Sequence, residues 1–465
     1  MPRRPFRSNL RFLLGVRWGL TAVLLPALVG RTFAQAQATD PGLISPYAPL
    51  TLPEDPEPEK TPTSPNTVTP WWQTNLPPNN LITGPRLGTD AIGSLVPGFN
   101  PAPPPMAGGS APSTPPILRW GPVTAHPFVS YGLTYGTGLL AGPGREENSL
   151  INTVSPGVSF DLGKYWNLSY TPSLVFYTTD GYQNTVNQSA SLSGGTTAGD
   201  WGLNLGSSFA KTDNPLVETG QQTEQTSSST QFGASRPLSS VWSLDLGITQ
   251  ALRWTGDFNN TFSWGVQSGL MYQLSQLISV GFDLGAGYDL VEPGTDMTHE
   301  SLQVAVNGAL GDKLSYSLSG GFEIRQFLDT GASQKLSPIM SGSLNYQMTE
   351  KTSFNVYANR SVSPSFFNDQ FTLATAIGGG LSQRVLGRFF LSLTGGFRWT
   401  ENNSTLDPTL EVQNTDYSFV RIGLSSRFLQ RGSASIFYLL SQNTSSDAAL
   451  SFDSNQVGMQ LSYGW

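Results

Sequence analysis

The residues that most often perform catalysis or hold metal ions are scarce in this chain. Its 465 residues include no Cys, which excludes disulfides, thiolate metal sites, cysteine nucleophiles and lipid attachment through cysteine. The two histidines, His126 and His299, are far apart in the sequence and lie in no recognisable motif. An embedded hydrolase would need a Ser/His or Asp/His group. We therefore expect both histidines at the surface, no enzymatic activity and no metal ion or other cofactor.

Charged side chains that alternate with apolar ones are the remaining candidates for chemistry. They interrupt segments such as 278–290 and 314–325 at every second position, which turns them away from the apolar face. Acids and bases opposed across a water-filled passage would orient polar solutes by their field. The alternative is that these charges only pair and solvate a wall. The candidates for lining a passage are Asp245, Asp283, Asp289, Glu323, Arg325, Arg384, Arg398, Arg421 and Arg427.

The segments that must position these charges have the period of a β-strand. Apolar residues occupy every second position in long stretches such as 242–249, 278–290 and 314–325, which predicts strands with one apolar face. The stretches exceed the roughly five or six residues of soluble strands and suit the roughly nine to eleven of a tilted membrane-spanning strand. A soluble sandwich would need more charge than the 12% present. We therefore predict an all-β transmembrane barrel.

Short polar links alternate with longer connections between these strands, which indicates an antiparallel up-and-down barrel. Eight short links, such as 275–276, separate nine longer connections, such as 211–224 and 360–369. This gives 18 strands, with 16 as the alternative because 150–162 and 367–384 are irregular. Even counts, short periplasmic turns and longer outer loops are typical of bacterial outer-membrane barrels. Aromatic residues near the strand ends are expected to form interfacial girdles, and they include Trp242, Trp254, Trp399 and Tyr177.

The first 36 residues are predicted to be a secretory signal peptide. Five arginines and no acid precede or flank an apolar run at 18–29, and the small residues Ala34 and Ala36 follow it. A basic, an apolar and a small-residue region in this order direct export, and such a short run cannot span a bilayer as a helix. The chain is therefore expected to leave the cytoplasm.

Residues 37–118 are predicted to be a disordered, proline-rich tether in the periplasm. Of the 34 prolines, 22 lie between Pro41 and Pro127, and a segment without an apolar period cannot build a core. Trp71 and Trp72 interrupt this region, either as a docking motif for a periplasmic partner or with no specific role. The predicted domains are the signal peptide at 1–36, the tether at 37–118 and the barrel at 119–465.

The predicted mature chain is acidic. Six of the 25 basic residues lie in the signal segment, which leaves 19 against 32 acidic residues. Nucleic acid is therefore not expected as a partner. The nine longer connections hold 17 acidic and five basic residues. An acidic outer rim is expected to concentrate cations, or to bind divalent ions that bridge to lipopolysaccharide phosphates.

The last ten residues form one more alternating segment that ends on an aromatic residue. Gln, Gly and Ser separate the members of its apolar face, which are Val457, Met459, Leu461, Tyr463 and Trp465. This ending resembles the C-terminal sorting signal of bacterial outer-membrane proteins, and the resemblance implies recognition by the barrel-assembly machinery. The other interpretation is a final strand without a signal role.

The segment from Leu118 to Phe176 resembles outer-membrane β-barrel porins of Gram-negative bacteria. The similarity lies in Tyr-Gly at 131–132 and 135–136, in the sequence TVSPGV at 153–158, and in Arg119-Trp120-Gly121-Pro122. These motifs are short and cover about sixty residues. Some members of that group are associated with exopolysaccharide export, which the resemblance adds as an alternative function.

A barrel of this size predicts a channel in the outer membrane. About 18 strands leave an aqueous lumen, and we expect passive passage of small hydrophilic solutes with a preference for cations. The alternatives are a component of exopolysaccharide export, or a structural or adhesive barrel that binds a partner through its loops or tether. Outer-membrane lipid and lipopolysaccharide are the expected surroundings, and the sequence is compatible with a homo-oligomer.

Overall fold

The computed structural model describes residues 118–137, 148–328, 331, 334–428 and 431–465. The predicted signal peptide (1–36), nearly all of the predicted tether (37–118) and the pair Trp71 and Trp72 lie outside the described residues, so these expectations stay predictions. No helix in the described part of the chain is long and apolar enough to cross a membrane.

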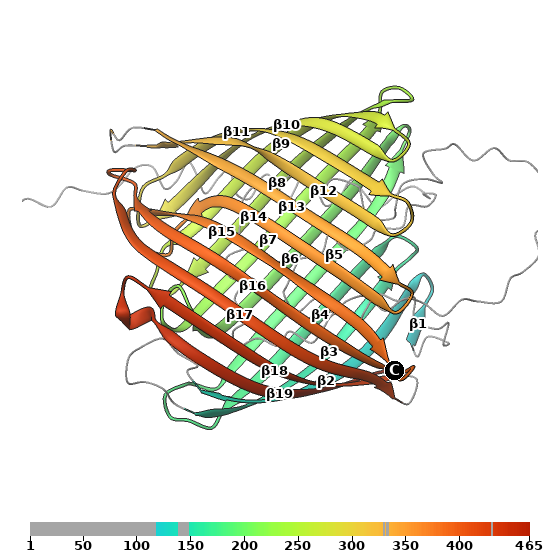
Figure 1. The fold of residues 1–465 in the computed structure, drawn as a ribbon, viewed down its shortest axis with the longest axis vertical. Coiled ribbons are helices and arrows are strands. Elements are labelled where there is room, and N and C mark those ends of the chain that lie inside the picture. The colour runs from blue at the N-terminus through green and yellow to red at the C-terminus, as the bar shows by residue number, and fades with distance from the viewer. Residues whose placement is uncertain (1–117, 138–147, 329–330, 332–333, 429–430) are drawn as a thin grey trace, which may run out of the picture.

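Within the described residues, 18 long antiparallel strands form one closed barrel (Figure 1). Each strand pairs with the next, and the last strand pairs with β2 to close the ring. The predicted fold class and strand count are therefore confirmed, as is the architecture implied by the resemblance to outer-membrane porins. A short strand, β1 (Leu118–Trp120), forms a hairpin with the start of β2, and a 3-10 helix, η2 (Ala448–Leu450), precedes the last strand.

The barrel strands follow one another in chain order. They are β2 (Val123–Thr137), β3 (Ser149–Leu162), β4 (Trp166–Tyr177), β5 (Thr185–Ala198), β6 (Trp201–Leu216), β7 (Gln221–Pro237), β8 (Trp242–Thr255), β9 (Asn260–Ser275), β10 (Ile278–Glu292), β11 (Met297–Leu310), β12 (Leu314–Phe327), β13 (Lys335–Thr349), β14 (Thr352–Pro364), β15 (Gln370–Val385), β16 (Phe389–Ser404), β17 (Glu411–Phe428), β18 (Gly432–Ser445) and β19 (Phe452–Gly464).

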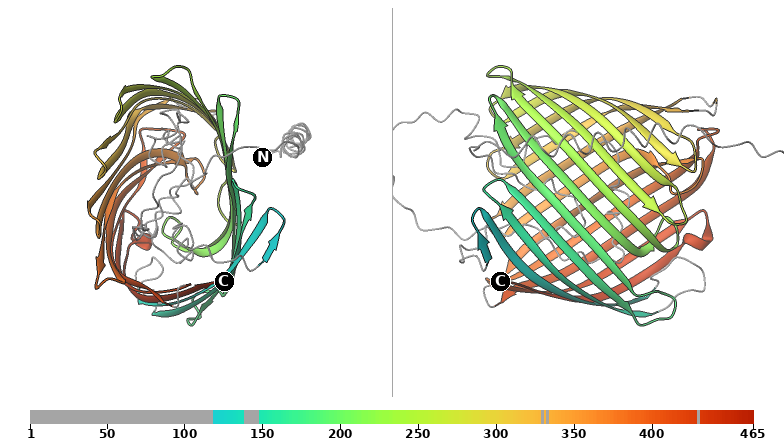
Figure 2. Two further views of the ribbon diagram at one scale, coloured as in Figure 1. Left: turned by 90° about the vertical axis from the view of Figure 1, so that its right-hand side faces the viewer. Right: turned by 180° about the vertical axis from the view of Figure 1, so that it is seen from behind.

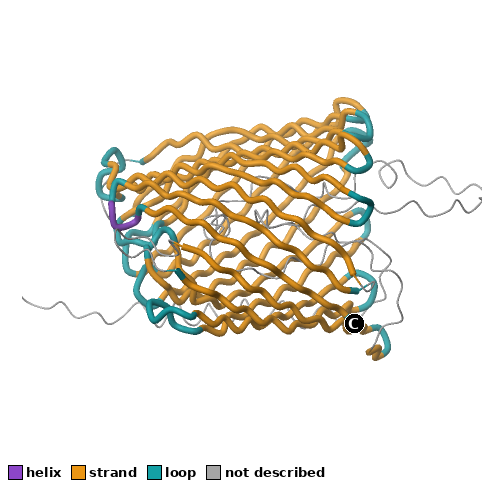
Figure 3. Tube along the Cα trace, turned by 60° about the horizontal axis from the view of Figure 1, so that its bottom comes forward, coloured by secondary structure: helices purple, strands orange, loops and turns teal. Residues whose placement is uncertain are grey.

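The short turns lie at one end of the barrel and the longer loops lie at the other (Figure 3). The C-terminus lies at the end with the short turns. One of these turns joins β15 to β16, where Leu386 and Gly387 both have positive φ angles of 49° and 78°, a backbone shape for which glycine is well suited. Some strands are longer than expected. Only 217–220 of the connection expected at 211–224 is loop, and the rest of it belongs to β6 and β7.

The outer faces of the strands are apolar and the inner faces are mostly polar. Phe282 and Leu284 of β10 are 57% and 59% exposed on the outside, where Val304 and Leu302 of β11 lie beside them. The residue between them, Asp283, is turned to the inside. Lipid offers no hydrogen bonds to the backbone, and a closed barrel leaves no unpaired edge. A closed barrel with this apolar exterior is therefore suited to span a membrane.

Of the four aromatic residues named above for the girdles, three lie on the outer face and one does not. Trp242, Trp254 and Trp399 are each about two-fifths exposed on the outer face. Tyr177 was expected among them, and this expectation is wrong. Its ring is only 8% exposed and stacks on Tyr182 at a centroid distance of 5.1 Å. It lies inside because the β4–β5 loop folds over the inner wall.

The C-terminal strand, β19, closes the barrel between β18 and β2. Val457 and Leu461 are 52% and 41% exposed on its outer face, whereas Gln456 and Ser462 on the inner face are buried. The terminal pair Tyr463 and Trp465 pack edge to face, with centroids 5.2 Å apart. The alternation predicted for this segment is thus present, while recognition of the segment by the assembly machinery stays a prediction.

A pair of neighbouring arginine substitutions tests the assignment of the two faces. Leu318 of β12 is 51% exposed on the outer face, and Ser319 is turned to the inside. We expect Leu318→Arg to lower the free energy of unfolding by about 2–4 kcal/mol, because it places a charge in lipid. Ser319→Arg should change it much less. Equal losses in denaturant titrations in lipid vesicles would contradict the assignment.

Candidate functional site

Several loops fold inward over the inner wall at the loop end of the barrel. A view along the barrel shows the green hairpin of β6 and β7 turned into the ring of strands (Figure 2, left). Tyr182 of the β4–β5 loop covers Tyr177, and Val217 of the β6–β7 loop packs against Tyr417 and Phe419 on the inner face of β17. The buried apolar clusters of this barrel therefore lie inside its loop end, where they hold loops against the wall.

The β14–β15 hairpin separates from β13 to take part in this arrangement, while β15 stays paired with β16 as far as Gln370 and Ser404. Pairing between β13 and β14 ends at Met340 and Arg360, whereas pairing between β14 and β15 continues to Pro364 and Phe371. Residues 361–373 thus separate from β13 and form a segment that we call the folded-in hairpin.

An apolar cluster fixes the folded-in hairpin to the inner wall. Phe371 is fully buried, and its ring lies 5.1 Å from that of Phe327, centroid to centroid. Val362 and Leu373 belong to the same cluster. The wall contributes one residue from each of four consecutive strands, namely Val291 of β10, Met297 of β11, Phe327 of β12 and Ile339 of β13. The folded-in hairpin therefore covers the inner face of β10 to β13 near their loop ends.

The tip of the folded-in hairpin reaches the β8–β9 loop, which is several strands away around the ring. Asn259 donates from its backbone N–H to the carbonyl oxygen of Phe366 at 3.0 Å and from Nδ2 to that of Phe367 at 2.7 Å. Arg253 of β8 donates to the carbonyl oxygen of Ser365 at 3.2 Å, and its guanidinium lies 4.0 Å from the Phe366 ring centroid. The tip is thus held in place across part of the lumen.

A buried network of charges lies under the folded-in hairpin. Arg325 donates to Asp289 Oδ2 at 3.1 Å and to Glu323 Oε1 at 3.0 Å, and all three side chains are at most 6% exposed. Arg325 also donates to the carbonyl oxygen of Val362 at 3.2 Å. These three predicted pore residues therefore face the inside, but they connect the wall to the hairpin instead of meeting open water.

His299 belongs to the same network, and the expectation that it lies at the surface is wrong. Its side chain is 6% exposed, and Nδ1 lies 3.4 Å from Asp289 Oδ2. His126 is more exposed, at 37%, and its Nε2 lies 2.9 Å from Asp161 Oδ2. The described residues contain no group of three or more His, Cys, Asp or Glu side chains that could hold a metal ion.

The β6–β7 loop (217–220) extends inward from the opposite side of the ring. Glu218 accepts a hydrogen bond from Arg398 of β16 at 3.0 Å, and the two side chains are 14% and 7% exposed. In the strand order, β7 and β16 are separated by half of the barrel. This ion pair therefore connects two opposite walls of the barrel. It explains why Arg398, one of the predicted pore residues, is nearly buried.

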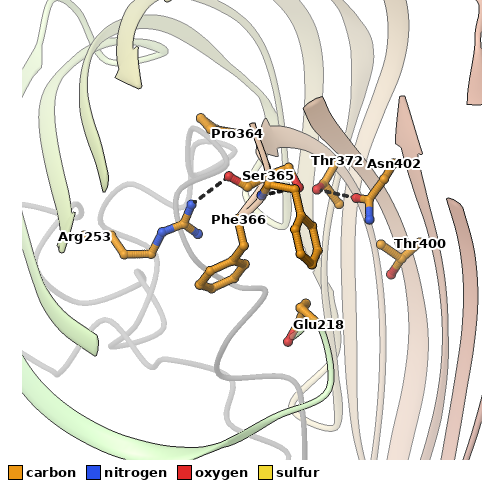
Figure 4. A pocket seen from close by; sticks show the side chains of 9 residues that line it. Glu218, Arg253, Pro364, Ser365, Phe366, Thr372, Thr400 and Asn402 are labelled. Atoms are coloured by element: carbon orange, nitrogen blue, oxygen red, sulfur yellow. Dashed lines mark hydrogen bonds between the residues drawn. The ribbon is translucent and has the colours of Figure 1, made fainter. Parts of the chain in front are cut away.

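A small pocket lies between the two inward-folded segments (Figure 4). Charges of both signs border it, since Glu218 lies at one side and Arg253 at another. Glu218 Oε2 is buried, and among the described residues it has no hydrogen-bond partner. The pocket is lined by Glu218, Arg253, Pro364, Ser365, Phe366, Phe367, Thr372, Thr400 and Asn402.

The two remaining predicted acids lie side by side on the inner wall. Asp245 and Asp283 are the cross-strand neighbours of Gly269 on its two sides. Because Gly269 has no side chain, Asp283 extends over it, and a Cβ at that position would lie 2.4 Å from Asp283 Oδ1. Both residues are partly exposed, although Asp283 Oδ2 is buried.

The three remaining predicted bases also face the inside. The Arg421 guanidinium lies 4.3 Å from the Phe437 ring centroid, and that of Arg384 lies 5.8 Å from the Phe390 ring centroid. Arg427 is exposed near the end with the short turns. None of them lines the pocket, so the nine predicted residues form several groups rather than one ring.

The pocket residues Glu218, Arg253 and Phe366 were not among the predicted site residues. Each lies in or beside a segment expected to be an outer connection. The one signal that could have indicated them is the apolar content of 360–369, where Val362, Phe366 and Phe367 are unusual for a solvated loop.

No model of a known protein family matches the chain, and no curated protein matches it. Solved structures with a similar fold include OccAB3 of Acinetobacter baumannii, at 10% identity and a TM-score of 0.40 over 73% of this chain and 99% of that one. They also include OpdK of Pseudomonas aeruginosa crystallised with vanillate, at 11% identity and a TM-score of 0.41 over 73% and 98%. These values are too low to transfer a property of those proteins to this chain.

The buried charge network predicts how firmly the folded-in hairpin is held. Since the chain has no Cys, Val362→Cys, at a position 2% exposed, would be the single thiol available for labelling. We expect a polar maleimide to label it slowly. Adding Arg325→Ala should speed labelling markedly, because it removes the arginine partner of two buried carboxylates and the hydrogen bond to Val362, at a cost of about 3 kcal/mol or more.

The control for this measurement is Arg427→Ala, which removes an exposed arginine away from the network. Labelling of Val362→Cys should be unchanged in that background. If Arg325→Ala and Arg427→Ala gave the same labelling rate in a barrel that remains folded, the network would not hold the hairpin.

Proposed function

We propose that the protein is an outer-membrane channel through which small hydrophilic solutes pass by diffusion, and that two inward-folded segments narrow it. The observation that carries this proposal is the combination of an 18-strand barrel with a polar inner wall and loops fastened inside it. Barrels of 16 to 18 strands enclose an aqueous channel. A barrel whose only role was structural or adhesive would have no need of a polar lumen bordered by opposed charges.

The narrowed region offers a solute both charge and apolar contact. Glu218 and Arg253 border the pocket, and the rings of Phe366 and Phe367 form part of its lining. Arg253 and Phe366 are each only 5% exposed, so these groups act on a passing solute mainly by restricting its size and by their charge. Size and charge would therefore both contribute to selection.

Two features support a preference for cations. The exposed acids at the loop end include Asp180, Asp257, Glu292, Glu300, Asp407, Glu411, Asp447 and Asp453. Further inside, Asp245 and Asp283 present neighbouring carboxylates to the lumen. Negative charge at the mouth and on the wall raises the local concentration of cations. The same rim could hold divalent ions that bridge to lipopolysaccharide phosphates.

Shortening the side chains at the tip of the folded-in hairpin should widen the passage. We expect the double variant Phe366→Ala/Phe367→Ala to accelerate swelling of liposomes in sugars and to admit larger sugars than the unmodified chain. The matched control is Leu386→Ala, in a turn at the opposite end where the side chain is 87% exposed. Liposomes that do not swell with any sugar, with or without the substitutions, would instead favour a structural or adhesive barrel.

Removing the paired acids of the inner wall should weaken the preference for cations. We expect the unmodified chain to give cation-selective reversal potentials in planar bilayers under a salt gradient. Asp245→Asn/Asp283→Asn should lower the cation-to-anion permeability ratio roughly two- to fivefold, since a charge near a passing ion in water contributes about 1 kcal/mol. Anion selectivity of the unmodified chain would refute the proposed preference.

A further inference from the structure

The outer face of β5 to β8 differs in chemistry from the rest of the barrel exterior. On β10 the outward residues from Ile278 to Leu290 are all apolar. On β5 to β8 the outward positions instead include a group of hydroxyl and amide side chains around the outward ring of Phe209, which we call the polar outer patch: Gln188, Ser207, Thr226, Ser228, Thr230 and Gln250.

The strand register places this patch on the outside. Ser207 lies opposite Thr230, and Thr230 lies opposite Gln250, so these residues share one face. The same face carries Phe232 and Ile248, which are 41% and 55% exposed. Inside and outside alternate strictly along a strand, so the patch lies between outward apolar residues on the surface that meets the membrane.

The described residues satisfy only part of the hydrogen-bonding capacity of the patch. Ser207 and Thr230 share one hydrogen bond, 3.0 Å between their hydroxyl oxygens. Among the described residues, no hydrogen-bond partner is found for the side chains of Ser228 and Gln250, although a Gln amide can both donate and accept. Hydrocarbon cannot supply the missing partners, and such side chains commonly bond between neighbouring membrane elements.

We propose that the polar outer patch is the surface through which two copies of this chain associate in the membrane. A second copy presents the same patch at the same depth, because both barrels have the same apolar band. Hydroxyl and amide groups both donate and accept, so the patch is complementary to itself, as an isologous interface requires. The face continues toward the loop end in Lys211 and Glu224, whose ion pair at 2.7 Å is about half exposed.

Crosslinking through engineered cysteines tests this interface directly, because the chain has no Cys of its own. Single substitutions Ser207→Cys, Ser228→Cys, Thr230→Cys and Gln250→Cys would be oxidised in intact outer membranes. We expect at least one of them to give a species of twice the mass of the chain. Ile377→Cys is the matched control, since it is 44% exposed on the outer face of β15, on the opposite side of the ring.

Apolar replacement of the patch provides a second and independent readout. The combined variant Thr226→Val/Ser228→Ala/Thr230→Val/Gln250→Leu should fold as a barrel but lose the crosslink formed through Ser207→Cys. Its mass in mild detergent should fall from that of an oligomer to that of one chain. Monomers of the unmodified chain, crosslinks of equal yield at Ile377→Cys, or crosslinks only to a different protein would each overturn the proposal.

Discussion

The need to pair every backbone hydrogen-bonding group within lipid determines most of this structure. Because no water reaches the backbone in the hydrocarbon layer, the sheet must close on itself, and β19 therefore pairs with β2. Closure separates two environments, and the alternation of residues along each strand follows from that separation. The low charge content and the long strands are consequences of the same constraint, since charge is concentrated in the lumen and at the loop end.

The constraint is relaxed only where the barrel leaves the hydrocarbon layer, and there the chain builds its internal contacts. Beyond Arg360, β14 gives up its pairing with β13 and turns inward. Apolar packing around Phe371 and the hydrogen bonds of Arg325 replace the lost strand pairing. On the opposite wall, the ion pair between Glu218 and Arg398 fixes a second segment. A wide barrel thereby acquires a narrowed end.

The strand pattern and the number of strands could be predicted from the sequence because both depend on local periodicity. For the same reason, the sequence could predict that the side chains of Asp289, Glu323 and Arg325 face the inside of the barrel. Their burial could not be predicted, because it depends on Val362, which approaches from another part of the chain. His299 and Tyr177 were misplaced for an equivalent reason: loops that appear solvated in the sequence fold back and cover them.

Single-channel recording with polymers of graded size added to one side of a planar bilayer tests the central claim, an aqueous passage narrowed at its loop end. The account predicts discrete current steps and an asymmetric response. Polymers of intermediate size should lower the conductance when they enter from the end with the short turns, and they should have little effect from the loop end. Equal effects from both ends would contradict the position of the narrowing, and the absence of any current would contradict the channel itself.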